Sequence, residues 1–228
     1  MNKVALVFGG TGGIGRAICY GLKNKGMTVY STSHKRISKN PYILHCDVTK
    51  NKTIESVVSQ ILKKESRIDL VINSVTPQLK LKTIESLSLR EFKEDIEAIL
   101  IGGININKAV IPIMKVNHGG IMINILSSLV LGDVSARMSS YISAKYGLAG
   151  FTKCLALELK KFNIFVFGIS PSFVETDLIK VFPEKFIEIE KNKRKDKKLI
   201  NPAEVARVIL NLVKNPQKYR TGDNIEIN

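Results

Sequence analysis

The sequence has few cysteines and histidines, and neither type is arranged for a structural role. Its three cysteines, Cys19, Cys46 and Cys154, are odd in number, far apart and set in apolar segments. This predicts buried free thiols rather than disulfides. The three histidines have no spacing typical of a metal site. We therefore expect no structural metal.

Long apolar runs are also missing. No segment approaches the roughly 18 consecutive apolar residues of a membrane-spanning helix, and the N-terminal MNKVALVFGG leads into glycines rather than to a signal-peptide cleavage site. We expect a cytoplasmic protein with no membrane partner. No internal repeat or low-complexity linker divides the 228 residues, and their 44% hydrophobic content suits a single soluble domain over residues 1–228.

Acidic residues are scarce beside basic ones, 20 against 35, and the formal net charge is +15. The lysines are scattered along helix faces and form no aromatic-and-basic face, so we expect no nucleic-acid partner. The densest charged run, residues 184–198, mixes both signs. It predicts a solvated helix or loop. The alternative is a basic patch for an acidic carrier protein or a phosphorylated substrate.

Short apolar runs alternate with helical patterns along the whole chain. The runs predict strands at residues 3–8, 27–32, 42–46, 68–73, 121–126, 164–169 and 225–227. Helical spacing predicts helices at 16–25, 52–64, 88–116, 141–159 and 202–213, the third interrupted near Gly102-Gly103 and Pro112. Such alternation implies a Rossmann-type doubly wound parallel α/β sheet of about seven strands, with helices on both faces in three α/β/α layers.

A glycine cluster stands between the first predicted strand and the first predicted helix. It contains the candidate cofactor-binding residues Gly9, Thr11, Gly12, Gly13, Ile14 and Gly15. Without side chains the backbone can approach a pyrophosphate, and a helix N-terminus can aim N–H groups at it. Glycines also make simple tight turns, but this position favours dinucleotide binding.

The end of the second predicted strand lacks the acidic residue that usually binds a free ribose 2′-hydroxyl. Ser33, His34, Lys35 and Arg36 stand there instead. Cations at this point favour the 2′-phosphate of NADP(H). The alternative is that Lys35 and Arg36 are ordinary loop charges of a basic protein.

Polar residues end two further strands. Asp47, followed by Val48, could bond the adenine amino group, help to cap the next helix, or do both. Asn73, followed by Ser74, ends the fourth strand with an amide that can tie adjacent strands together or touch the cofactor.

Tyr141 and Lys145 are four residues apart, which places both side chains on one face of a helix. The lysine cation would stabilise the phenolate and lower the tyrosine pKa from about 10 toward neutrality. Ser128 follows a predicted buried strand, so its hydroxyl would project from the sheet edge and orient the reacting oxygen. A Tyr and a Lys at this spacing are also common as a solvated pair, but the other motifs favour catalysis.

Together, these ordered motifs resemble the short-chain dehydrogenase/reductase family, particularly its 3-oxoacyl-[acyl-carrier-protein] reductase-like members, over nearly the whole chain. The family's TGxxxGxG loop matches residues 8–15 and its NNAG stretch matches residues 73–76. Its serine and YxxxK motif match Ser128, Tyr141 and Lys145, and its adenine-side aspartate matches Asp47.

The resemblance implies an enzyme that uses NADP(H) to reduce a carbonyl substrate, either a small molecule or one bound to an acyl carrier. Tyr141 would protonate the carbonyl oxygen, Ser128 would hydrogen-bond it, and Lys145 would bind the nicotinamide ribose. The resemblance also implies a homodimer or homotetramer.

The segment after the sixth predicted strand matches family positions near the nicotinamide. These are Pro171 of the PG-type segment, Val174 and Thr176. Residues 176–198 are expected to form the lid that selects the substrate.

The chain departs from the family pattern at Ile99, where many members have an asparagine that holds a proton-relay water. Isoleucine cannot bond water. This departure leaves open a second function, an NADP(H)-binding protein with weak or no catalysis that acts as a sensor or assembly subunit.

Overall fold

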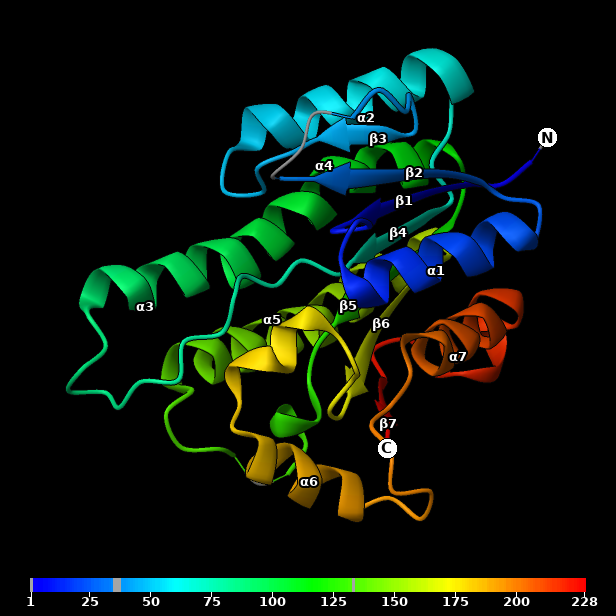
Figure 1. Ribbon diagram of the computed structural model, residues 1–228. Coiled ribbons are helices and arrows are strands. Elements are labelled where there is room, and N and C mark those ends of the chain that lie inside the picture. The colour runs from blue at the N-terminus through cyan, green and yellow to red at the C-terminus, as the bar shows by residue number, and fades with distance from the viewer. Residues whose placement is uncertain (1, 35–37, 133) are drawn as a thin grey trace.

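The computed structural model describes residues 2–34, 38–132 and 134–228. The strands are β1 (Val4–Phe8), β2 (Thr28–Ser33), β3 (Ile43–His45), β4 (Leu70–Asn73), β5 (Gly120–Ile125), β6 (Ile164–Pro171) and β7 (Asn224–Ile227). They form a 7-stranded sheet in the order β3-β2-β1-β4-β5-β6-β7, with every pairing parallel (Figure 1). The predicted doubly wound parallel sheet is confirmed.

Helices cover both faces of the sheet. They are α1 (Gly13–Asn24), α2 (Asn51–Glu65), α3 (Leu89–Asp95), the π-helix η1 (Ile96–Ile101), α4 (Gly102–Val116), α5 (Ser139–Leu159), α6 (Glu184–Asn192), α7 (Pro202–Lys214) and the 3-10 turns η2 (Ser128–Val130), η3 (Lys160–Phe162), η4 (Asp177–Val181) and η5 (Pro216–Lys218). One apolar cluster joins α1 and α7 to the sheet, and another joins α2, α4 and α5 to its opposite face. These are the predicted three layers.

The central strand β1 shows why a continuous apolar run suits this fold. Its five residues are all buried, because a parallel sheet has helices on both faces. Leu6 and Phe8 face the cluster beneath α2 and α4, whereas Ala5 and Val7 face the cluster beneath α1 and α7. Alternate side chains therefore supply both halves of the core.

The segment predicted as an interrupted helix over 88–116 is continuous. It begins at a capping box between Ser88 and Glu91, widens into η1 and continues as α4 with Pro112 inside it. The predicted breaks at the glycines and the proline are therefore wrong. Gly103 serves close packing instead, since a Cβ there would lie 2.8 Å from Leu148 Cδ1.

By length and composition alone, this 28-residue helix, Leu89–Val116, could also cross a membrane. Its Ile99, Ile106, Val110 and Met114 side chains are almost completely buried within the described protein. That burial is typical of a helix that packs against a sheet.

One of the three cysteines differs from the prediction of buried thiols. Cys46 is buried and Cys19 is half-buried, but Cys154 is exposed. It lies on α5, whose outward side also carries the exposed Tyr146 and Leu157. An apolar sequence context does not separate a core-facing position from one on the opposite side of the same helix.

The segment between β6 and α7 leaves the sheet at Pro171 and contains η4 and α6, which lie beyond the carboxyl ends of the strands (Figure 1). Val174 and Ile200 form a parallel bridge at its base. The basic run is a largely exposed helix and loop, as predicted. Part of its charge is neutralised, because Lys193 pairs with Glu190 at 2.6 Å and Arg194 with Glu204 at 3.1 Å.

Candidate active site

The glycine loop packs tightly between β1, β4 and the lid. Gly9 has a φ of +74°, and a Cβ on it would lie 2.7 Å from the Ser74 carbonyl oxygen. The Gly12 amide donates to the Gly9 carbonyl at 3.0 Å. Thr176 lies against Gly13, where any Cβ would collide with its side chain. Side chains are therefore excluded at the points where the loop turns and the lid approaches it.

The loop leads into a helix N-terminus suited to an anion. Gly12 is the N-cap of α1 and supplies no side-chain hydrogen bond, and the first turn contains no acidic residue. The first N–H groups of a helix have no partner within it and carry partial positive charge. Backbone close to the ligand and an uncapped helix end fit the pyrophosphate of a dinucleotide.

The predicted ribose site lies at the end of β2. Ser33 is the last residue of this strand, and His34 Nε2 lies 3.8 Å from Asp47 Oδ2. Lys35 and Arg36 lie outside the described residues. The described part of the site contains no acid at the strand end itself.

Asp47 organises the turn that leads into α2 without being its N-cap, which is Lys50. Its Oδ1 accepts hydrogen bonds from the Thr49 amide at 3.1 Å and the Thr49 hydroxyl at 2.7 Å. Partial burial opposes the charged form, but these hydrogen bonds and the ion pair with Lys50 outweigh it and lower the pKa of Asp47. The neighbouring Val48 is buried against Gly102.

Asn73 belongs to a buried amide network. Asn124 Oδ1 accepts from Asn73 Nδ2 at 3.4 Å and from Asn107 Nδ2 at 3.2 Å, and Asn124 Nδ2 donates to Thr152 Oγ1 at 3.1 Å. The network joins β4, α4, β5 and α5. Of the two predicted roles for Asn73, tying strands together is the one that these contacts show.

Tyr141 is held in place by the residue before it. Ser140 Oγ donates to Asp95 Oδ2 at 2.5 Å, and Asp95 also pairs with Lys80 at 3.1 Å. Both Ser140 and Asp95 are buried. This contact fixes the first turn of α5 against α3 and the loop after β4.

The serine beside Tyr141 is Ser127, not Ser128. The Tyr141 hydroxyl makes a side-chain hydrogen bond with Ser127, which directly follows Leu126 at the end of β5. Ser128 begins the 3-10 turn η2. Ser128, predicted to orient the substrate oxygen, also lines the cavity, but the contact with the phenol comes from Ser127, because the chain turns immediately after Ser127 and consecutive side chains then point in different directions.

Lys145 is buried beneath Tyr141. Its Nζ donates to the Ile125 carbonyl at 2.7 Å and to Thr76 Oγ1 at 3.4 Å, and it lies 5.7 Å from the centre of the Tyr141 ring. Burial lowers the pKa of Lys145 to about 7. Burial likewise raises the pKa of Tyr141 to about 12, although the Ser127 hydrogen bond opposes the rise.

The expected lowering of the Tyr141 pKa by Lys145 is therefore not found. The expectation assumed a solvated, fully charged lysine, whereas Lys145 is buried and Tyr141 is half-buried at the cavity wall. Desolvation disfavours the phenolate more than the neighbouring serine favours it.

A cavity of about 480 Å³ opens between the glycine loop, Tyr141 and the lid. The sequence-predicted residues that line it are Gly12, Gly13, Ile14, Gly15, Ser74, Ser128, Tyr141, Pro171, Val174 and Thr176. Ser127 and Thr76 line it as well. The structure thus brings the phenol and hydroxyl candidates to the same hollow as the helix N-terminus, at the carboxyl ends of the strands.

A family model described as short chain dehydrogenase matches residues 3–185. The chain belongs to this family. Short-chain dehydrogenases are oxidoreductases that use a nicotinamide cofactor, and the glycine cradle, the uncapped α1 and the adjoining Tyr141 fit such a group.

Several known proteins are similar over nearly their full length. The chain is 31% identical to the 3-oxoacyl-[acyl-carrier-protein] reductase FabG of Thermotoga maritima, over 99% of this chain and 96% of the relative. It is 32% identical to carbonyl reductase family member 4 of Xenopus laevis, over 97% and 94%. The ligand-free aldohexose dehydrogenase of Thermoplasma acidophilum superposes with a TM-score of 0.89 at 25% identity, covering 99% of this chain and 92% of that one.

This short-chain dehydrogenase has an apolar side chain at position 99, within a π-helix. Ile99 lies within η1, is 1% exposed and packs with Leu126, Ala144 and Leu148. It is therefore a core residue beneath the site. Its side chain can make no hydrogen bond to a relay water.

Three parts of the cavity lining were not predicted from the sequence: Ser127, Thr76, and the phenylalanines Phe173 and Phe182. Ser127 could have been found as the first polar residue after β5, since it directly follows Ile125 and Leu126. Thr76 stands out because its family position is a glycine. The phenylalanines of the lid carry no spacing signal, because they come together only through the fold.

Proposed function

We propose that the chain is an NADPH-dependent oxidoreductase that reduces a ketone, 3-oxoacyl-like or another small carbonyl compound, to a secondary alcohol. One observation carries the proposal: Tyr141 and Ser127 meet at the wall of a cavity whose other end is the glycine cradle at α1. The printed names of the FabG and carbonyl reductase relatives support reduction of a carbonyl group.

Ser127, Tyr141 and Lys145 have different roles in the proposed reaction. A dinucleotide whose pyrophosphate is bound at the cradle would supply the hydride from its nicotinamide. Ser127 hydrogen-bonds the substrate oxygen, and Tyr141 donates its proton to that oxygen as negative charge develops there. With a pKa raised to about 12, Tyr141 holds its proton at neutral pH and has it available for the oxygen. Lys145 orients the site from beneath and binds the nicotinamide ribose.

The choice of NADPH over NADH rests on the end of β2. Ser33 and His34 stand where an acid would repel a 2′-phosphate, and Lys35 and Arg36 follow in the sequence. Titration of the purified protein should show tighter binding of NADPH than of NADH. Lys35→Ala combined with Arg36→Ala should narrow that difference, and equal affinities in the wild type would refute the assignment.

The activity test follows NADPH oxidation with a panel of ketones. Wild type should turn over, and Tyr141→Phe should lower kcat by about 100-fold or more while still binding NADPH. Ser127→Ala should be more damaging than Ser128→Ala, because Ser127, of these two serines, is the one that contacts the phenol in the described structure. Tight NADPH binding without turnover of any ketone would favour the sensor or assembly function, for which the buried Ile99 is the supporting observation.

We also propose a homodimer or homotetramer and a cytoplasmic location. The exposed Tyr146 and Leu157 on α5, 45% and 72% exposed, support self-association through this helix. The substrate is either free or held on an acyl carrier. The relatives' names support the carrier, and the exposed lysines of residues 191–198 offer it a basic surface.

A further inference from the structure

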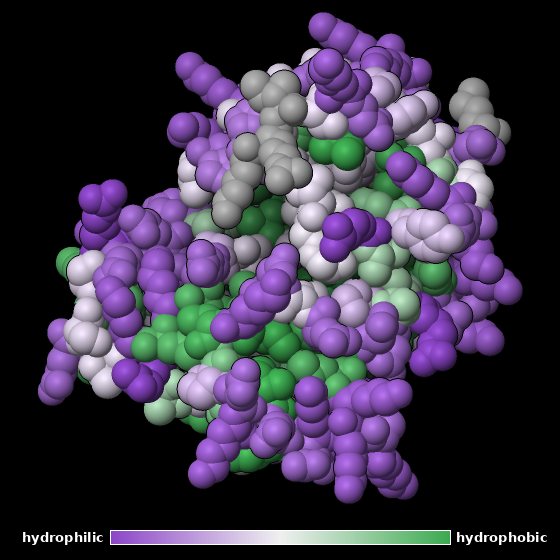
Figure 2. Space-filling view, in the orientation of Figure 1, coloured by the Kyte–Doolittle hydropathy of each residue, from purple (hydrophilic) through white to green (hydrophobic). Residues whose placement is uncertain are grey.

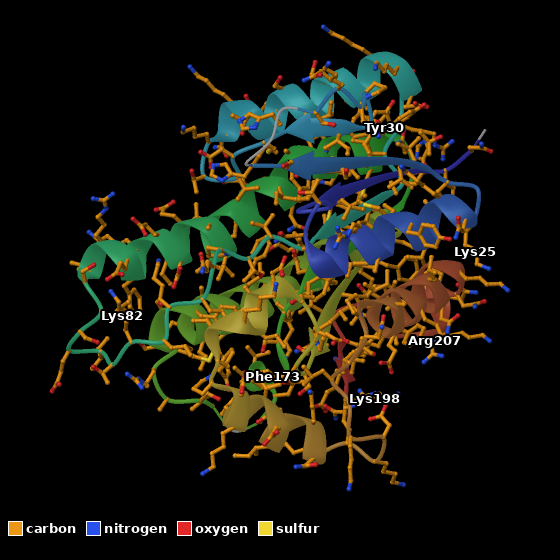
Figure 3. The ribbon with its side chains drawn as sticks, viewed as in Figure 1. Lys25, Tyr30, Lys82, Phe173, Lys198 and Arg207 are labelled. Atoms are coloured by element: carbon orange, nitrogen blue, oxygen red, sulfur yellow. The ribbon has the colours of Figure 1, made fainter. Side chains whose placement is uncertain are left out.

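Three phenylalanines of the segment between β6 and α7 form an aromatic cluster that we call the phenylalanine wall: Phe173, Phe182 and Phe186. The Phe173 ring lies 5.4 Å from the Phe182 ring at 78° and 5.4 Å from the Phe186 ring at 66°, and Phe182 stacks on Phe186 at 5.0 Å. Phe173 and Phe182 line the same cavity as Tyr141. Figure 3 shows Phe173 between α6 and the sheet.

The phenylalanine wall is not part of the hydrophobic core. None of its three rings belongs to the core clusters formed by the described residues, and all three are only half-buried. Hydrophobic surface gathers in the region where η4 and α6 lie, between hydrophilic side chains (Figure 2). The rings therefore keep apolar area that a ligand can cover.

The charges that line the cavity also favour an uncharged, apolar ligand. Among its described lining residues there is no lysine or arginine, and Asp177 is the only carboxylate. The Asp177 side chain is 91% exposed and pairs with Lys180 at 2.6 Å, so it leaves no free counter-charge for a cation. A carboxylate or phosphate close to the reacting carbonyl would lose water without gaining an ion pair.

We propose that the site selects uncharged carbonyl compounds whose apolar substituent, an aryl ring in the best case, packs against Phe173 and Phe182. The inference rests on the proposed reductase function and names its substrate class. Aromatic rings favour offset and edge-to-face contacts with one another, and the tilted pair at Phe173 and Phe182 presents both a face and an edge. Free oxo acids and sugar phosphates are the compounds that the site disfavours.

Three methyl ketones that differ at one end test the proposal. Butanone ends in a methyl group, benzylacetone adds a phenyl ring to it, and levulinate adds a carboxylate. We expect kcat/KM for benzylacetone to exceed that for butanone by about 10- to 100-fold, the range for burying a large apolar group. Levulinate should be the poorest of the three. Equal values for benzylacetone and butanone, or a preference for levulinate, would overturn the proposal.

Substitutions test whether the preference for benzylacetone over butanone depends on the phenylalanine wall. Phe182→Ala and Phe173→Ala should each lower the ratio of benzylacetone to butanone by about tenfold, with little change for butanone. Phe162→Ala is the matched control, because Phe162 packs near Lys115 and Lys161 and does not line the cavity. A ratio lowered equally in all three variants would contradict the assignment.

Binding gives a measurement that does not depend on turnover. Saturation-transfer NMR should detect benzylacetone on the wild-type chain and lose the signal in Phe182→Ala, with levulinate unable to compete. If no ketone is reduced but this binding pattern holds, the reductase function fails and the apolar selection stands. If ketones are reduced but benzylacetone shows no preference in either experiment, the apolar selection fails and the reductase stands.

Discussion

Thr76 makes a contact with Lys145 that a glycine, the residue of the family's NNAG pattern at this position, could not make. Lys145 Nζ has two described acceptors, the Ile125 carbonyl at 2.7 Å and Thr76 Oγ1 at 3.4 Å. Ile99 offers none. Thr76 therefore helps to position a lysine that lacks the support of a polar residue at position 99.

Removal of this acceptor should impair the reaction without unfolding the chain. Thr76→Val keeps the shape of the side chain but not the oxygen, and we expect kcat to fall about tenfold, the lower end for a hydrogen bond to a charged group. Thr76→Ser should retain most of the activity. The measurement is kcat and KM for both variants, and a valine variant as active as the serine variant would rule out the positioning role.

Lys145 should make the free energy of unfolding depend on pH. Burial lowers its pKa from 10.5 to about 7, so between these values the unfolded state binds the extra proton. The contribution is complete above pH 10.5 and is lost as the pH falls toward about 7. The facing phenol of Tyr141 has its pKa raised to about 12 and stays protonated through most of this range.

Urea unfolding of wild type and Lys145→Met at several pH values tests this. The difference in unfolding free energy between them should change in favour of wild type by up to about 1.4 kcal/mol per pH unit as the pH rises. A difference that is flat across the window would mean that the lysine stays charged in the folded chain.

Short sequence motifs were enough to predict most of the site residues, but not the contacts that these residues make. The Tyr141–Lys145 spacing and the glycine loop could be read from the chain because each works within one turn or one helix. The Ser127 contact depends on where β5 ends, and a shift of one residue changes the side chain that faces Tyr141. The perturbed pKa values depend on burial, which neither residue's neighbours in sequence reveal.

At the scale of elements, the amide network joins two strands to the helices that cover them. Asn124→Ala would leave Asn73, Asn107 and Thr152 without their shared partner in a buried place. We expect a loss of about 3 kcal/mol in unfolding free energy by urea titration. Asn117→Ala is the matched control, because the buried Asn117 Nδ2 has no hydrogen-bond partner among the described residues, and it should cost less than about 1 kcal/mol. Equal losses would show that the network contributes no special stability.

The strands were predictable because each is a short apolar run, and most helices were predictable because their apolar residues have helical spacing. The π-helix η1 was not predictable. The sequence of Ile96–Ile101 is typical of an ordinary α-helix, and the one extra residue in its turn does not change the amino-acid composition. Pro112 was misread as a break for a related reason. The burial of Val110 and Met114 holds α4 together and outweighs the proline's helix propensity.

At the scale of the whole molecule, the parallel sheet followed from the alternation of strands and helices, but its strand order and the assembly of the chain were not predicted. Because Leu157 on α5 is exposed, we predict self-association, which sedimentation equilibrium measures as the molar mass in solution. Wild type should exceed the 25.3 kDa of one chain, and Leu157→Glu should shift it toward the monomer. Ile189→Glu on α6, 51% exposed, is the control and should leave the assembly intact. A wild-type monomer would contradict self-association through α5.

The central claim is that Tyr141 donates a proton while hydride passes from a nicotinamide to a ketone carbon. A single turnover with NADPH that carries deuterium at the transferable position of its nicotinamide tests it most directly, with the label read by mass spectrometry of the product. We predict deuterium on the carbinol carbon with wild type and almost none with Tyr141→Phe at equal NADPH occupancy. Wild type that binds NADPH yet transfers no label to any ketone, or a phenylalanine variant that transfers it as fast as wild type, would contradict the account.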